Sequence, residues 1–126
     1  MLTDKRVKAF VPAADADTAK KFYGETLGFK LLSEDNYGNE FEMNQVSLRV
    51  SFVSADHLQP QRHTILGWTV QDILETFNFL KGRGIVFEKY DFLEQDENNI
   101  WTARGGTQVA WFKDPAGNLL SIDQQA

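Results

Sequence analysis

The chain has 126 residues, with 13 Lys and Arg against 18 Asp and Glu, a formal net charge of −5 and no cysteine. The lack of cysteine excludes disulfides, thiolate nucleophiles and Cys-ligated metal sites, and only His57 and His63 offer imidazole ligands. The acidic balance argues against binding to nucleic acid or to an anionic membrane, because both need clustered Lys and Arg.

A cytoplasmic, single-domain protein is expected from the length and the hydropathy pattern. No apolar run reaches the roughly 18–20 residues of a membrane span, and the N-terminal segment lacks the apolar region of a signal peptide. The aromatic fraction of 13% is high for a small core. Some aromatic side chains could therefore line a cavity, although all of them could instead fill the core.

The first half predicts a strand, a helix and three further strands. An apolar stretch at Val7–Val11 is followed by Asp15 and Asp17, either of which suits a helix cap, and Gly28 suits the left-handed end of that helix. Helical spacing places four apolar side chains on one face, namely Ala19, Phe22, Tyr23 and Leu27. Strands are then predicted at Lys30–Ser33, Glu40–Met43 and Val46–Val53.

The second half repeats this pattern. Ile65–Val70 is apolar, Asp72 suits a helix cap, and Gly84 suits the end of a helix whose apolar face carries Ile73, Phe77 and Leu80. Strand-like stretches follow it at Ile85–Tyr90, Asn99–Ala103, Thr107–Lys113 and Leu119–Asp123, one more than in the first half. We therefore predict one domain, 1–126, made of two similar βαβββ modules, 1–55 and 62–126, joined by the polar linker 56–61.

Two motifs resemble a known family. FYGETLGF (Phe22 to Phe29) and WFKDPAGNLLSI (Trp111 to Ile122), in this order, resemble the vicinal oxygen chelate superfamily of glyoxalase, bleomycin-resistance and extradiol dioxygenase proteins. The resemblance implies an α+β fold in which two βαβββ modules form a cup-shaped open barrel, with the helices outside. It also implies a small-molecule cavity between the modules and, in many small members, a homodimer. Within the second motif, Asp114 is expected to hold a tight turn.

The resemblance also allows a test for the metal site of this superfamily, whose enzymes hold one divalent metal through His, Gln or Glu side chains. The matching positions carry Lys8, Ile65 and Ser121, none of which is a usual ligand. We therefore expect no metal cofactor. The alternative is a displaced divalent metal site at His63, which has the same strand parity as Ile65.

Strand alternation predicts which side chains face the cavity. Lys8 and Arg49 are two such cations, which either pair with carboxylates such as Glu42 or Asp123 or receive an anionic or carbonyl-bearing ligand. The opposite parity places Trp68 under a helix. Alternation does not decide which face Trp101 and Trp111 occupy. The predicted ligand-binding residues are Lys8, Phe10, Arg49, Ser51, Ile65, Thr69, Trp101, Trp111 and Ser121.

The function predicted from these observations is metal-independent binding of a small molecule by a homodimeric protein. The alternative is a metal-dependent lyase, isomerase or dioxygenase that uses a site near His63. A cofactor-free enzyme using Lys8 or Ser121 has less support, because no paired base or orienting carboxylate is visible in the sequence.

Overall fold

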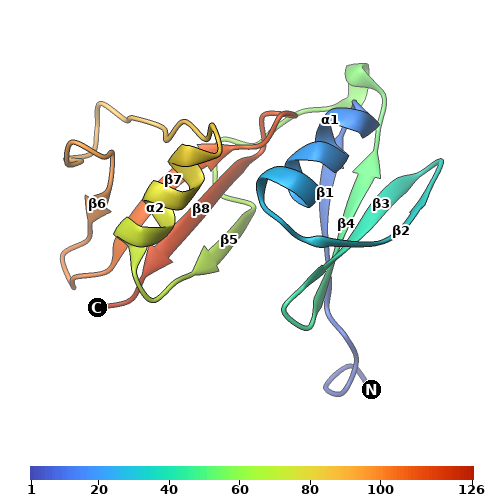
Figure 1. Ribbon diagram of the computed structural model, residues 1–126, viewed down its shortest axis with the longest axis horizontal. Helices are drawn as coiled ribbons and strands as arrows, with labels where there is room; N and C mark the ends of the chain where they lie inside the picture. The colour runs from blue at the N-terminus through green and yellow to red at the C-terminus, as the bar shows by residue number, and fades with distance from the viewer. The chain divides into compact units, whose positions relative to one another are not determined.

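The computed structural model describes residues 1–126 as two units, Met1–Pro60 and Gln61–Ala126. Each unit carries one four-stranded sheet with a helix on one of its faces (Figure 1). This arrangement confirms the predicted α+β class and its two βαβββ modules. No helix of the chain combines the length and the apolar character needed to cross a lipid bilayer.

Unit 1 has the strand order β1-β4-β3-β2, with β1 parallel to β4 and the other neighbours antiparallel. The first and last strands of the unit are therefore hydrogen-bonded side by side. Its elements are β1 (Lys8–Ala13), α1 (Ala16–Lys21), β2 (Lys30–Asp35), β3 (Gly38–Met43) and β4 (Val46–Phe52).

The core of unit 1 lies between α1 and one face of the sheet. Tyr23 is buried beside Phe41, and their ring centroids are 6.1 Å apart. The predicted apolar face of the helix is largely correct, since Ala19, Phe22 and Tyr23 are buried and Leu27 is half-buried. The helix ends in a π-helical turn, in which the Leu27 N–H donates to the Phe22 carbonyl over 2.8 Å.

Unit 2 has the equivalent order β5-β8-β7-β6. Its helix packs against β7 and β8, where Phe112 is buried and stacks on Trp68 with ring centroids 6.4 Å apart. This contact confirms that Trp68 lies on the core side. The elements are β5 (Leu66–Thr69), α2 (Ile73–Gly82), β6 (Trp101–Thr102), β7 (Gln108–Lys113) and β8 (Leu119–Gln124).

The strand predicted at Ile85–Tyr90 is wrong. Only an isolated bridge joins Phe87 to Phe112, because the side chain of Gln95 occupies backbone groups that a strand would use. Gln95 accepts from the Tyr90 N–H over 2.7 Å and donates to the Glu88 carbonyl over 3.0 Å. The same amide donates to the Asn99 carbonyl, and the strand predicted at 99–103 is correspondingly short.

Both helices begin at predicted aspartate caps, and Asp15 rather than Asp17 caps the first of them. Asp15 Oδ1 accepts from the Thr18 N–H and Asp72 Oδ1 accepts from the Glu75 N–H, each over 3.0 Å. The Thr18 N–H lowers the pKa of Asp15 below its ordinary value of 3.8. Gly28 and Gly84 have φ of 83° and 91°, the left-handed conformation predicted for the ends of the two helical segments.

The cap at Asp72 has a measurable contribution to stability. Asp72→Ala is expected to lower the free energy of unfolding by about 1 kcal/mol, because the first turn of α2 loses a backbone acceptor. Urea denaturation followed by circular dichroism measures this change. Asp91→Ala, at an exposed position in the loop after α2, is the matched control and is expected to leave the midpoint unchanged. Equal effects of the two substitutions would contradict the capping role.

Candidate functional site

The face of the unit 1 sheet opposite α1 collects the predicted binding residues of this unit. The register pairs Lys8 with Ser47, Phe10 with Arg49 and Pro12 with Ser51, so these side chains share one face. The alternate residues, such as Val11 and Val50, are buried on the helix side. Lys8, Phe10, Arg49 and Ser51 thus lie on one open surface, on which Phe10 is 62% exposed.

Both cations on this surface form ion pairs with carboxylates of other strands. Lys8 Nζ lies 3.1 Å from Glu40, and Arg49 Nη2 lies 3.0 Å from Asp35. The predicted partners of these two cations are therefore wrong. Glu42 pairs with Arg6 instead, which adds a 2.7 Å hydrogen bond to Ser47. Asp123 belongs to unit 2, where its carboxylate accepts from the Thr69 hydroxyl over 2.9 Å.

Gly38 explains how Arg49 reaches Asp35. A Cβ atom at Gly38 would lie 2.9 Å from Nε of Arg49, so the guanidinium occupies the space that a side chain would fill. Asp35 also accepts from the Tyr37 N–H over 2.7 Å and from the Gly38 N–H over 3.0 Å. These interactions hold the pKa of Asp35 below its ordinary value of 3.8. The bond from the Tyr37 N–H has the largest effect, and the Arg49 guanidinium and the Gly38 N–H add to it.

Arg49→Met is expected to raise the pKa of Asp35 without restoring it fully, because the stronger bond from the Tyr37 N–H remains. A carboxyl-carbon NMR titration measures this pKa. The lowered value means that the carboxylate stabilises the fold above pH 3.8, and that this contribution is lost as the pH falls through the folded-state pKa. An unchanged pKa in Arg49→Met would show that the ion pair does not persist in solution.

The open face of the unit 2 sheet carries both tryptophans whose orientation alternation left undecided. Trp111 pairs directly with Ser121, which in turn pairs with Gly67. Trp101 pairs with Val109, two positions before Trp111 on the same strand. Side chains directly opposite each other share a face, so Trp101, Trp111 and Ser121 all lie on the side of the sheet opposite α2.

These tryptophans form the centre of an aromatic cluster. Their ring centroids are 6.1 Å apart, and Tyr90 meets Trp111 edge-on at 5.6 Å. Trp111 Nε1 donates to the Thr64 hydroxyl over 3.1 Å, which fixes the orientation of the indole. Both indoles remain half-buried. The result is a rigid, partly accessible aromatic wall of the kind that planar ligands stack against.

Two members of this cluster were missed at the sequence level. Tyr90 and Phe92 pack against each other with ring centroids 5.4 Å apart, and Phe92 is 81% exposed. Tyr90 ends the segment where a strand was wrongly predicted, and Phe92 lies in the loop just after it, so alternation could not assign either side chain. Partial burial, with the nearby charge of Glu88, raises the pKa of Tyr90 above its ordinary 10.0. The high aromatic content was the only available signal.

The remaining predicted residues of unit 2 lie on the same face of the sheet as this wall. Ser121 is 7% exposed, and a Cβ atom at Gly67 would lie 2.6 Å from its hydroxyl oxygen, so the bare backbone of Gly67 makes room for that hydroxyl. Ile65 is half-buried and Thr69 is exposed. The structure therefore groups Ile65, Thr69, Trp101, Trp111 and Ser121 within unit 2.

The side chains at the superfamily's metal-ligand positions do not fit a divalent cation. Lys8 is engaged as an ammonium with Glu40, Ile65 is a hydrocarbon, and Ser121 offers only a neutral hydroxyl. His63, the alternative ligand, is exposed. Nowhere in residues 1–126 do three or more His, Cys, Asp or Glu side chains come together in an arrangement that could hold a metal ion.

Solved structures with the same fold include several glyoxalase-family proteins. One from Enterococcus faecalis has 23% identity and a TM-score of 0.73, with 98% of this chain and 99% of that chain covered. One assigned to the family from Bacillus anthracis has 18% identity and a TM-score of 0.76, with 100% and 98% covered. Lactoylglutathione lyase from Agrobacterium tumefaciens has 14% identity and a TM-score of 0.72, with 96% and 93% covered.

None of the curated proteins shows significant sequence similarity to the chain. The family profile described as Glyoxalase/Bleomycin resistance protein/Dioxygenase superfamily matches residues 6–122. This match spans both units and includes the FY and DP-x-GN motifs. The chain therefore belongs to the Glyoxalase/Bleomycin resistance protein/Dioxygenase superfamily.

Proposed function

We propose that the protein binds a small planar organic molecule against Trp101 and Trp111, without a metal cofactor. The observation that carries this proposal is the pair of half-buried indoles on the open sheet face, held 6.1 Å apart and away from the core. Aromatic stacking on such a wall contributes about 0.5–1.5 kcal/mol per ring pair beyond the area that is buried. The same face also carries two hydroxyl groups, of Ser121 and Thr69, and one apolar side chain, Ile65, at the edges of the proposed site.

Lys8, Phe10, Arg49 and Ser51 form a second proposed ligand-binding surface, on unit 1. Its two cations are already paired with carboxylates, so this surface favours a polar, overall neutral ligand group more than a free anion. The proposal further includes a cytoplasmic homodimer with no nucleic-acid or membrane partner. The net charge of −5 supports the absence of polyanionic partners. Sedimentation equilibrium measures the oligomeric state, and a monomer at all concentrations would contradict the dimer.

The binding proposal is tested with a panel of planar aromatic compounds in neutral, anionic and cationic forms, followed by tryptophan fluorescence. A compound that binds the parent is expected to lose about tenfold in affinity with Trp101→Ala or Trp111→Ala, as expected when a stacking partner is removed. Tyr37→Ala, at an aromatic position that is 78% exposed on unit 1, is the control. Binding that is unaffected by both tryptophan substitutions would overturn the proposed site.

The metal-dependent alternative makes a different prediction. A lyase, isomerase or dioxygenase using His63 requires a stoichiometric divalent metal that is lost in His63→Ala. Elemental analysis of protein purified without chelator or affinity tag measures this directly. Such a metal would overturn the metal-independent proposal, whereas substoichiometric metal that is equal in parent and variant would support it.

A further inference from the structure

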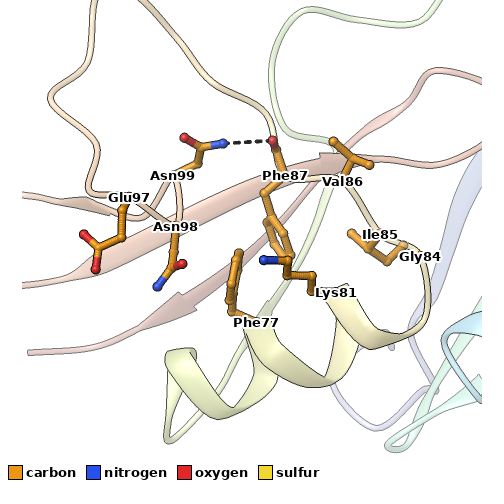
Figure 2. A pocket seen from close by; sticks show the side chains of 9 residues that line it. All are labelled: Phe77, Lys81, Gly84, Ile85, Val86, Phe87, Glu97, Asn98 and Asn99. Atoms are coloured by element: carbon orange, nitrogen blue, oxygen red, sulfur yellow. Dashed lines mark hydrogen bonds between the residues drawn. The ribbon is translucent and has the colours of Figure 1, made fainter.

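A pocket of about 360 Å³ lies in unit 2 on the α2 side of the sheet, away from the tryptophan wall. Figure 2 shows it between the C-terminal half of α2 and the loop of residues 97–99, with segment 84–87 along its other edge. Its size falls within the range of small-molecule sites. None of the residues that line it is among the predicted ligand-binding residues.

The floor of this pocket is apolar and well packed. Phe77 and Phe87 are 5% and 6% exposed, with ring centroids 4.7 Å apart, and Ile85 beside them is also buried. Phe87 contacts Phe112 of the core edge-on at 5.6 Å. An apolar group that enters the pocket therefore meets a fixed surface anchored to the centre of the unit.

One cation and one anion stand at the edges of this floor. Lys81, near the end of α2, holds its Nζ 5.8 Å from the centroid of the Phe77 ring, and Glu97 stands on the facing loop (Figure 2). Neither side chain takes part in an ion pair within the chain. The pocket thus offers a ligand one positive and one negative side chain, and the charges of these two side chains cancel.

Hydrogen bonds hold the loop wall in place. The Asp96 carboxylate accepts from the Asn98 N–H over 2.8 Å and from the Ile100 N–H over 2.9 Å. Asn99 Nδ2 donates to the Phe87 carbonyl over 3.2 Å, which ties the loop to the floor. The Asn99 backbone has a φ of 62°, a conformation uncommon for a side-chain-bearing residue. A wall held in this way lowers the entropic cost of binding.

We propose that this pocket binds a small zwitterion with an apolar side chain, such as an aromatic α-amino acid. The ligand carboxylate pairs with Lys81, its ammonium pairs with Glu97, and its side chain packs on Phe77 and Phe87. A molecule with only one of the two charges leaves the opposite charge of the pocket without a partner, and a purely apolar molecule leaves both.

The experiment titrates L-phenylalanine into the full chain and follows the backbone amide resonances of Val86, Asn98 and Asn99 by NMR. Saturable shifts are expected, with a dissociation constant on the order of 1 mM or below. Two probes keep the ring and lose one charge each: 3-phenylpropanoate lacks the ammonium and 2-phenylethylamine lacks the carboxylate. Each probe is expected to bind the parent protein about tenfold more weakly than L-phenylalanine does. L-phenylalanine itself is expected to bind the Lys81→Met and Glu97→Gln variants about tenfold more weakly than the parent.

Lys89→Met is the matched control, because Lys89 is exposed just after the pocket-lining segment 84–87 but does not itself line the pocket. It is expected to bind like the parent. The proposal is overturned if L-phenylalanine causes no saturable shift, if either single-charge probe binds as tightly, or if Lys81→Met and Lys89→Met behave alike. Shifts confined to the amides around Trp101 and Trp111 would also overturn it and assign the binding to the tryptophan wall.

Discussion

Replacing Phe112 with alanine is expected to lower the free energy of unfolding by about 3–5 kcal/mol. Phe112 is 1% exposed, stacks on Trp68 on one side and meets Phe87 edge-on at 5.6 Å on the other. The substitution leaves a cavity between the sheet and the segment after α2. Since domains of this size have total stabilities of about 5–15 kcal/mol, the loss is a large part of the whole.

Urea denaturation followed by far-UV circular dichroism measures this effect without relying on the tryptophan signal that the substitution itself perturbs. Phe92→Ala is the matched control, because Phe92 is 81% exposed, and its effect is expected to stay within about 0.5 kcal/mol. If both substitutions had the same small effect, Phe112 would not be a central core residue.

Replacing Asp114 with alanine is expected to lower the free energy of unfolding by about 3 kcal/mol, since each buried donor left unpaired costs about 1–3 kcal/mol. Asp114 is 5% exposed and lies in the turn between β7 and β8. One of its oxygens accepts from the Ala116 N–H over 3.0 Å and the Asn118 N–H over 2.9 Å. The other accepts from Asn118 Nδ2, also over 2.9 Å.

Asp114→Asn separates the acceptor role from other contributions. The amide keeps one acceptor oxygen and loses the other, so the expected destabilisation lies between those of the parent and Asp114→Ala. The same urea experiment measures both variants. A loss below about 1 kcal/mol in Asp114→Ala would show that the carboxylate does not hold this turn.

Local sequence signals predicted the features that depend on neighbouring residues. Asp15, Asp72 and Asp114 bind backbone N–H groups a few positions away, so their residue type and position were sufficient. Strand alternation correctly separated the open face from the core face on β1, β4, β5 and β8. The period of two is a property of the strand itself and needs no knowledge of the partner strand.

The features that failed depend on contacts between distant segments. The segment at Ile85–Tyr90 is apolar enough for a strand, but its backbone is bound by the side chain of Gln95, whose position no periodicity reports. The partner of Arg49 depends on the missing side chain at Gly38, on a neighbouring strand. The faces of Trp101 and Trp111 required the register of β6 and β7. Each of these features depends on which distant segments pair with each other, and neither composition nor local periodicity reports that pairing.

The parallel pairing of the first strand of each unit with its last strand has a consequence for synthesis on the ribosome. β1 must wait for β4, and β5 must wait for β8, because in each unit the first strand bonds only to the last. The nascent unit 2 therefore carries β5, α2 and the tryptophans of β6 and β7 before β8, the only partner strand of β5, has been synthesised. During that interval the apolar side chains of these elements are not yet covered by β8, so the nascent chain is most prone to aggregate at this stage. Chaperones that hold unfolded chains, or a low temperature, are expected to help most at this point.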